Sequence, residues 1–309
     1  MQHLLKVYQL IQPHIHKTPI LHSRLLNEAA LASVFLKCEN FQKTGSYKPR
    51  GAINAILNLS EEQKNKGVLT HSSGNFAGAL SLAAKNLGVK AYIVMPSSAP
   101  EIKRKAVHEY GGIVTISGPT LAEREMASEK ILQETGATFI HPSNDIDVID
   151  GQGTACYELL QDESNFDFII APIGGGGLIA GTCLFTHAFS PSTKVIGAEP
   201  FAVDDAYRSL ISKKIETNES TNTVADGLKT QLGNHNFPII LKHLEQVIRV
   251  SEDEIVAAMR FVWERMKITI EPSSAVAVAA VFKEPSLFKN KKVGVLISGG
   301  NVDVTKLPF

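Results

Sequence analysis

A lysine at the expected start of a helix is the first feature of this sequence that could carry out covalent chemistry. Lys48 precedes Pro49, which fits the first position of a helix, and the following residues have apolar groups at helical spacing. The positive end of a helix dipole lowers the pKa of an amine placed there. Such an amine can attack a carbonyl and form a Schiff base. On frequency alone, a solvated surface lysine is the simpler alternative.

A run of four glycines is the second candidate site, because it follows an apolar strand and opens a helix. The run consists of Gly174, Gly175, Gly176 and Gly177. Backbone N–H groups converge in such a turn and the helix N-terminus adds positive potential, so the pattern is typical of a phosphate site. The stretch also has the G-x-G-x-x-A spacing of a dinucleotide site, with Glu199 ending the next strand. A dinucleotide, however, would give Lys48 no role.

Two loops at the expected carboxyl ends of strands carry further polar groups. The first contains Ser72, Ser73, Gly74 and Asn75. Its donors suit a second anion such as a carboxylate, although an ordinary helix cap fits as well. The second begins at Ser298, whose hydroxyl could bond a ring nitrogen or close a turn. With the lysine and the glycine run, these loops complement pyridoxal phosphate that carries an amino acid.

Strands alternate with helices along most of the chain, which predicts an α/β fold with parallel sheets and right-handed crossovers. The expected strands are 33–38, 68–71, 91–95, 113–116, 138–141, 166–173, 194–199, 247–250 and 292–297, and the expected helices are 76–86, 100–109, 120–135, 152–161, 252–266 and 273–282. The regular block 67–144 could form a small domain inserted into a larger one. Residues 212–236 have no regular pattern, and loops of that length are often functional.

The composition is that of a globular protein and points away from several classes of partner. Of its 309 residues, 44% are hydrophobic, and its 31 basic residues balance its 31 acidic ones. This balance favours neither nucleic acid nor a membrane surface as a partner. The three cysteines are scattered and the first residues lack the pattern of a signal peptide, so we expect a cytoplasmic protein with reduced thiols.

The chain closely resembles the fold-type II pyridoxal-phosphate enzymes, and within them the serine/threonine dehydratase and serine racemase group. The likeness covers nearly all of the sequence and is carried by 41–52, 72–75, 151–154, 174–177, 223–227, 261–267, 271–274 and 298–303. It implies two parallel-sheet domains, each with three αβα layers, and a cofactor in the cleft between them. The large domain would comprise residues 1–57 and 145–309, and the small domain 67–144. The resemblance also implies a homodimer.

The resemblance implies a role for each matching residue. Lys48 corresponds to the Schiff-base lysine and catalytic base, and the glycine run to the phosphate loop. Cofactor contacts are further implied for Asn75, Glu271 and Ser298, and substrate contacts for Ser72, Ser73, Gly74, Asn75 and Arg124.

A divalent-cation site is implied at Glu199, Asp205 and the carbonyl of Val203, where oxygen ligands suit Mg²⁺ or Ca²⁺. An acidic surface loop is the alternative there.

Ser73 bears on the choice between two reactions. In racemases of this group, a serine at this position returns a proton on the face opposite the lysine, whereas threonine dehydratases usually have alanine. Because Ser73 permits racemisation without requiring it, we expect a dehydratase that converts L-serine or L-threonine to a 2-oxo acid and ammonia. The alternative is an amino-acid racemase acting on serine or aspartate. A β-replacement synthase and a non-catalytic nucleotide-binding module are more distant rivals. Phe76 replaces the usual histidine of the group, which puts the substrate in doubt.

Overall fold

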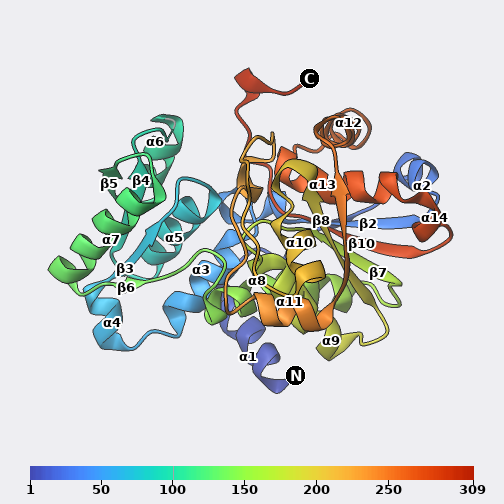
Figure 1. Cartoon of the computed structure of the whole chain (residues 1–309). Coiled ribbons are helices and arrows are strands. Elements are labelled where there is room, and N and C mark those ends of the chain that lie inside the picture. Colours follow the sequence, from blue (N-terminus) through green and yellow to red (C-terminus); the bar gives the residue numbers. More distant parts are fainter. Residues whose placement is uncertain (100) are drawn as a thin grey trace.

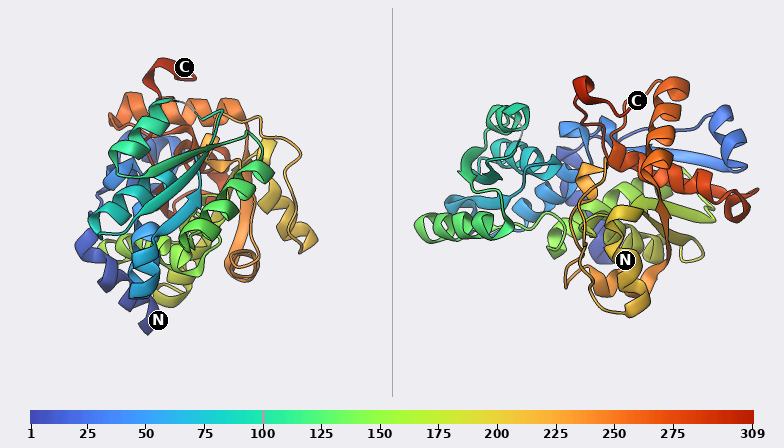
Figure 2. Two further views of the ribbon diagram at one scale, coloured as in Figure 1. Left: turned by 90° about the vertical axis from the view of Figure 1, so that its left-hand side faces the viewer. Right: turned by 45° about the horizontal axis from the view of Figure 1, so that its top comes forward.

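The computed structural model describes residues 1–99 and 101–309 and arranges them around two β-sheets (Figure 1). One sheet has six strands and the other has four, and the smaller sheet stands to one side of the larger with its own helices (Figure 2). Residue 100, the first of the expected helix 100–109, lies outside the described residues. The architecture is the α/β fold with parallel sheets that the sequence predicts.

The larger sheet has the order β1-β2-β10-β7-β8-β9, and all of its strands are parallel except β1. Its strands are β1 (Ile20–Leu21), β2 (Ser33–Cys38), β7 (Phe168–Pro172), β8 (Lys194–Pro200), β9 (Leu244–Val250) and β10 (Lys292–Ile297). Every residue of β7 is buried, because helices cover both faces of the sheet. This burial explains why the central strands are continuous apolar runs in the sequence.

Two helical layers enclose the larger sheet. The layer packed around β10 and Phe288 contains α2 (Arg24–Ala30), α12 (Glu252–Phe261), α13 (Pro272–Lys283) and α14 (Pro285–Phe288). The opposite layer contains α1 (Gln2–Ile11), α8 (Ile146–Asp162), α9 (Gly177–Phe189), α10 (Asp205–Ser212) and α11 (Phe237–His243). Each layer has its own hydrophobic core against the sheet.

The smaller sheet has the order β5-β4-β3-β6 and is parallel throughout. Its strands are β3 (Val68–His71), β4 (Ala91–Pro96), β5 (Ile113–Ser117) and β6 (Thr138–Phe139). The accompanying helices are α3 (Lys48–Leu57), α4 (Glu61–Lys66), α5 (Asn75–Asn86), α6 (Glu101–Glu109) and α7 (Leu121–Thr135). Apolar residues of α3 and α5 share a core with β3 and β4, and α7 packs on the other face.

Several elements differ from those expected; strand β9, for example, begins three residues before the expected 247–250. Helix α8 begins at Ile146, six residues before the expected start, because the side chain of Asp145 accepts a hydrogen bond from the Val148 backbone and caps it. The expected strand 138–141 pairs over Thr138 and Phe139 alone. The expected helix 252–266 changes to a wider π-helix at Val262–Met266.

Helix α8 touches its two neighbours backbone to backbone at small residues. A Cβ at Gly151 would lie 2.8 Å from the Gly51 Cα of α3, and one at Gly153 would lie 2.6 Å from the Gly181 oxygen of α9. Real Cβ atoms do not approach other atoms this closely. Glycine at these points lets α3 and α9 pack tightly on either side of α8, in the middle of Figure 1.

Within residues 1–99 and 101–309, no helix is both long enough and apolar enough to cross a lipid bilayer.

Candidate active site

Lys48 is the first residue of α3, as the sequence predicts, and it is half-buried. Its Nζ donates a hydrogen bond of 3.2 Å to the Pro142 carbonyl and lies 4.8 Å and 5.8 Å from the ring centroids of Tyr47 and Phe76. Burial lowers the pKa of the Lys48 amine to about 8, although the negative charge of Glu271 acts in the opposite direction. The direction is the one predicted from the helix N-terminus, with burial as its cause.

The loop that carries Lys48 is fixed to the loop that follows the last strand. The Tyr47 N–H donates to the Ser298 carbonyl at 3.0 Å, and the Gly300 N–H donates to the Gly45 carbonyl at 2.9 Å. A short antiparallel bridge joins the two segments between these bonds. The loop before Lys48 and the loop that begins at Ser298, far apart in sequence, therefore adjoin.

Asn75, at the start of α5, is held by two partners from the other lobe. Its Nδ2 donates to both Glu271 carboxyl oxygens, at 3.0 Å and 3.1 Å, and its Oδ1 accepts from Asn301 Nδ2 at 2.9 Å. Glu271 is 4% exposed, and burial raises its pKa to about 7. This network brings together three of the segments that the sequence singled out: 72–75, 271–274 and 298–303.

The four glycines form a buried turn between β7 and α9, as predicted. Gly176 has a φ of 84°, a conformation that side chains rarely adopt. Asn236 Nδ2 donates to the Gly175 carbonyl at 2.7 Å and to the Ser143 carbonyl at 2.9 Å. Asn236 is fully buried and ties the glycine turn to the segment after β6. Asn236 could not be recognised from the sequence, because it is one amide in a long irregular stretch.

Gln152 is a second buried amide that sequence analysis did not single out as a site residue. It lies on α8, and its Nε2 donates to the Pro142 carbonyl at 3.1 Å. Lys48 and Gln152 thus bond the same oxygen. The Gln152 Oε1 atom has no hydrogen-bond partner among the described residues and lies against the Gly177 backbone. The only sequence signal was the 151–154 motif that contains it.

The loop Ser72–Gly74 lies between β3 and α5 and is open to solvent. Ser72 and Ser73 are half-buried, Gly74 is exposed, and the Gly74 N–H approaches the Ser72 hydroxyl at 3.4 Å. The loop continues directly into Asn75 and Phe76, which face Glu271 and Lys48. It therefore borders the Lys48 site.

Two histidines and an arginine bring nitrogen donors to this border. Burial and the nearby Arg124 charge lower the pKa of His71, and the Arg124 Nε atom is buried without a partner among the described residues. Burial, together with the charges of His71 and Lys48, lowers the pKa of His141 to about 4. His141 Nδ1 accepts N–H bonds from Ser143 and Asn144, so the hydrogen of this neutral ring is assigned to Nε2.

The proposed cation residues lie apart from the Lys48 cluster, between β8 and α10. Glu199 and Asp205 are fully buried, and burial with the Asp205 charge raises the Glu199 pKa well above its usual value. Glu199 accepts N–H bonds from Ala206 and Tyr207 at 3.1 Å and 2.9 Å. Among the described residues, no three His, Cys, Asp or Glu side chains form a metal cluster, so an ion here would also need the Val203 carbonyl or water.

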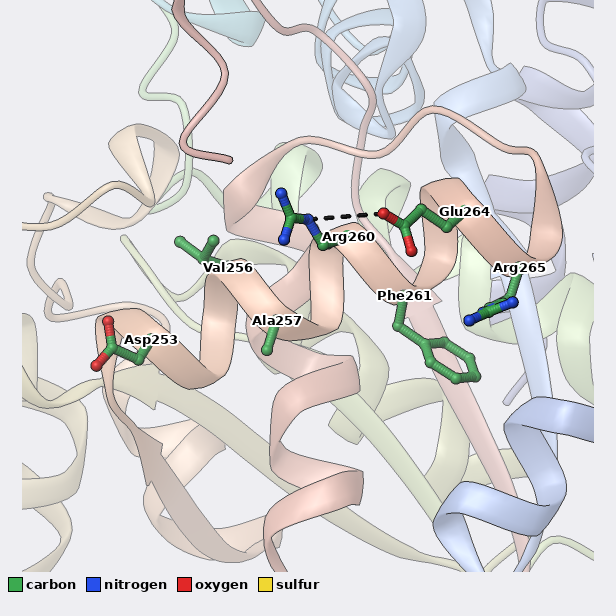
Figure 3. Close-up of a pocket in the computed structure, with 7 residues that line it drawn as sticks. All are labelled: Asp253, Val256, Ala257, Arg260, Phe261, Glu264 and Arg265. Atoms are coloured by element: carbon green, nitrogen blue, oxygen red, sulfur yellow. Dashed lines mark ion pairs between the residues drawn. The ribbon is translucent and has the colours of Figure 1, made fainter.

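A separate pocket of about 390 Å³ lies on α12 and the π-helix after it (Figure 3). It is lined by Asp253, Val256, Ala257, Arg260, Phe261, Glu264 and Arg265. Arg260 and Glu264 lie four residues apart on the same helical segment and form an ion pair of 3.7 Å. None of these residues belongs to the Lys48 cluster.

Comparison with known proteins places the chain in a family. The family model described as "Pyridoxal-phosphate dependent enzyme" matches residues 11–299. A serine racemase of Dictyostelium discoideum is 49% identical over 98% of this chain and 94% of its own length. A beta-hydroxyaspartate dehydratase of Paracoccus denitrificans is 46% identical over 99% of this chain and 97% of its own. The structure of maize serine racemase superposes with a TM-score of 0.96 at 41% identity, covering 98% of this chain and 94% of the maize chain.

The chain therefore belongs to the pyridoxal-phosphate dependent enzymes, in the fold-type II group. Its candidate site fits the cofactor that gives the family its name. The buried glycine turn has no side chains to exclude a phosphate, and the amine of Lys48 has a lowered pKa. The Ser46 Oγ atom is buried without a partner among the described residues, as expected where a polar group is to bind.

Proposed function

We propose that the protein is an amino-acid racemase that acts on serine and also dehydrates it. The sequence alone favours the dehydratase, but two of the three relatives described above are serine racemases, which favours the racemase alternative. The single observation that carries the proposal is the juxtaposition of the Lys48 amine with the helix that follows the Ser72–Gly74 loop, through Phe76. This arrangement gives a substrate one amine base and one serine-containing loop.

Several residues would hold the cofactor and set its properties. The N–H groups of the glycine turn would bind its phosphate, Asn75 its ring hydroxyl and Ser298 its ring nitrogen, and Glu271 would support Asn75. When bound, pyridoxal phosphate supplies an electron-withdrawing ring that stabilises the charge left by removal of the α-proton. With a serine beside the ring nitrogen, this withdrawal is weaker than it would be beside a carboxylate, which favours early loss of a β-hydroxyl.

The residues of the chain would perform the proton transfers. Lys48, with a pKa of about 8, is neutral in about a tenth of molecules near pH 7 and can take the α-proton. Ser73 would return a proton from the opposite side, and the donors of Ser72 and Gly74 would hold the α-carboxylate. Arg124, with its free Nε donor, would contribute to binding at the same border.

A second candidate substrate has an additional carboxylate. The border of the site has nitrogen donors on Arg124, His71 and His141. A single substrate carboxylate would not need all of them. The Paracoccus denitrificans relative is a beta-hydroxyaspartate dehydratase. We therefore include 3-hydroxyaspartate as a substrate whose second carboxylate would face these side chains.

Glu199, Asp205 and the Val203 carbonyl remain our proposed site for Mg²⁺ or Ca²⁺. Two adjacent buried carboxyl groups are costly without a counter-charge, which supports a cation there.

The test is a substrate panel of L-serine, D-serine, L-threonine and 3-hydroxyaspartate, assayed for inversion at the α-carbon and for 2-oxo acid release. Serine inversion that is lost in Ser73→Ala, while 2-oxo acid release persists, supports the racemase. Purified protein that releases 2-oxo acid from L-serine without producing D-serine would make the dehydratase the correct function.

A further inference from the structure

We propose that Gln152 is a positioning residue for Lys48: it holds the Pro142 carbonyl as a docking point for the free lysine amine, and it remains the partner of that carbonyl when the amine is bound elsewhere. Lys48 Nζ and Gln152 Nε2 donate to this oxygen at 3.2 Å and 3.1 Å. A carbonyl oxygen has two lone pairs and accepts both bonds.

The position of Gln152 follows from helix packing. Its neighbours Gly151 and Gly153 are the points where α3 and α9 touch α8. Helix α3 begins with Lys48, and α9 begins at the glycine turn. Gln152 is fully buried and lies where the lysine helix and the phosphate turn come closest to α8.

The segment around Pro142 is independently fixed. Asn236 ties the Ser143 carbonyl to the glycine turn, and His141 accepts the N–H groups of Ser143 and Asn144. The Pro142 carbonyl is therefore held in one position, and the Lys48 amine can bond it again after leaving it.

The unpaired end of Gln152 indicates which of its atoms is used. Its Oε1 is buried with no partner among the described residues, which is costly for a side chain that serves packing alone. An apolar side chain of the same length would fill the space without that cost. We infer that the N–H donor to Pro142 accounts for the glutamine.

This role has a consequence for covalent binding of the cofactor. When Lys48 attaches to the cofactor aldehyde, its nitrogen bonds to the aldehyde carbon and the aldehyde oxygen leaves as water, so the amine can no longer donate freely to Pro142. With Gln152 present, the carbonyl still has a donor. In a variant without this donor, the carbonyl loses both partners, and covalent attachment is weakened relative to the state with a free lysine.

Two ligands separate this effect from a general loss of the site. Pyridoxal phosphate attaches to Lys48, whereas pyridoxamine phosphate has no aldehyde and leaves the amine free. In Gln152→Met, we expect the dissociation constant of pyridoxal phosphate to rise by roughly 5-fold or more, the lower end of the cost of an unpaired buried acceptor. The dissociation constant of pyridoxamine phosphate should change by less than about twofold.

Two further variants make the test decisive. Gln152→Leu also lacks a donor and adds no charge beside the glycine turn, so it should show the same selective loss and covers a Met variant that does not fold. Asn236→Leu loosens the glycine turn without removing a donor from Pro142, so it should raise the dissociation constants of both ligands alike. If the two Gln152 variants raise the dissociation constants of both ligands equally, the proposal is wrong.

The proposal rests on Lys48 as the residue that binds the cofactor covalently, and that assignment can be tested separately. Borohydride fixes an imine irreversibly, so Lys48→Ala should leave no cofactor fixed to the protein. Fixation that persists in this variant contradicts the lysine assignment. If Lys48→Ala abolishes fixation but Gln152→Met weakens the binding of both ligands equally, the lysine assignment holds and only the role proposed for Gln152 is wrong.

Discussion

The hydroxyl oxygens of Ser274 and Ser298 lie 3.0 Å apart, and the backbone of Gly299 determines which of them donates. Ser274 Oγ accepts the Gly299 N–H at 2.7 Å and donates to the Gly299 carbonyl at 2.7 Å. A hydroxyl has one hydrogen, so the bond between the two serines is donated by Ser298. Ser298 is thus oriented by Ser274, and to bond an unprotonated ring nitrogen, its proposed partner, it would turn this hydrogen from Ser274 to that nitrogen.

This arrangement predicts unequal effects of two similar substitutions. Ser274→Ala leaves the Gly299 N–H without its partner, so we expect a loss of about 1–3 kcal/mol in the free energy of unfolding. Ser298→Ala leaves the Gly299 bonds intact and should cost about 1 kcal/mol or less. Urea unfolding of the cofactor-free proteins measures both values, and a larger loss in Ser298→Ala contradicts the hydrogen-bond assignment.

The lowered pKa of Lys48 predicts the pH dependence of cofactor attachment. Only the neutral amine attacks an aldehyde, so attachment should slow as pH falls below the pKa of about 8, by about tenfold per pH unit, and level off above it. Stopped-flow absorbance after mixing cofactor-free protein with pyridoxal phosphate gives the rate. A midpoint near 10.5, the ordinary lysine value, would mean that burial does not activate this amine.

The glycine turn and the start of α3 were predictable because each depends on neighbouring residues. An apolar strand, four glycines and a helix are consecutive in sequence, and Pro49 marks the first turn of the helix after Lys48. Strand β7 was equally clear, since a strand buried on both faces must be apolar at every position.

Gln152 and Asn236 could not be found in the same way. Each is a single amide whose partner is not a neighbour in sequence: Gln152 bonds Pro142, ten residues away, and Asn236 bonds Gly175, 61 residues away. The early start of α8 was missed because Gly151 and Gly153 weaken a helical pattern. Their close contacts with α3 and α9 explain the glycines, but only once the packing is known.

A fully buried ion cluster beside the active-site helix should be important for stability. The Arg50 guanidinium donates to the carboxylates of Glu39 and Glu158, and Lys37 also donates to Glu158. Removing one partner leaves uncompensated buried charge, so Arg50→Met should lower the free energy of unfolding by about 3–5 kcal/mol at neutral pH.

The pH dependence and a surface control test this explanation. Burial alone would raise the Glu158 pKa, but the charges of Arg50 and Lys37 hold it below its usual value. In the wild type, this carboxylate therefore contributes stability at neutral pH that is lost as pH falls through its lowered pKa. Without Arg50, Glu158 is protonated more readily. The difference in the free energy of unfolding between the wild type and Arg50→Met should therefore become smaller as pH falls. Lys17→Ala breaks an exposed pair with Asp162 and should cost less than about 1 kcal/mol.

The proposed cation site predicts stabilisation by a divalent ion. Mg²⁺ at about 100 times its dissociation constant should add about 2.7 kcal/mol to the free energy of unfolding, because it binds the folded state. Differential scanning calorimetry with Mg²⁺ or with a chelator should show this as a higher melting temperature. Asp205→Asn removes one carboxylate and should abolish the shift, so an undiminished shift in that variant would place the ion elsewhere.

The contact between α8 and α9 predicts that a single methyl group will disturb the molecule. In Gly181→Ala, the new Cβ would lie 2.6 Å from the Gly153 nitrogen and 2.7 Å from the Gly153 Cα, both backbone atoms, so the helices must move apart. We expect a loss of about 1–3 kcal/mol or more in the free energy of unfolding, as for overpacked cores. Gly74→Ala is the matched control, because nothing lies within 4 Å of its added Cβ, and its unfolding should change by less than about 0.5 kcal/mol. Because α9 begins at the glycine turn, Gly181→Ala should also weaken the binding of pyridoxamine phosphate. This binding depends on the glycine turn and not on covalent attachment to Lys48. A variant as stable as the wild type would show that the two helices are not in backbone contact.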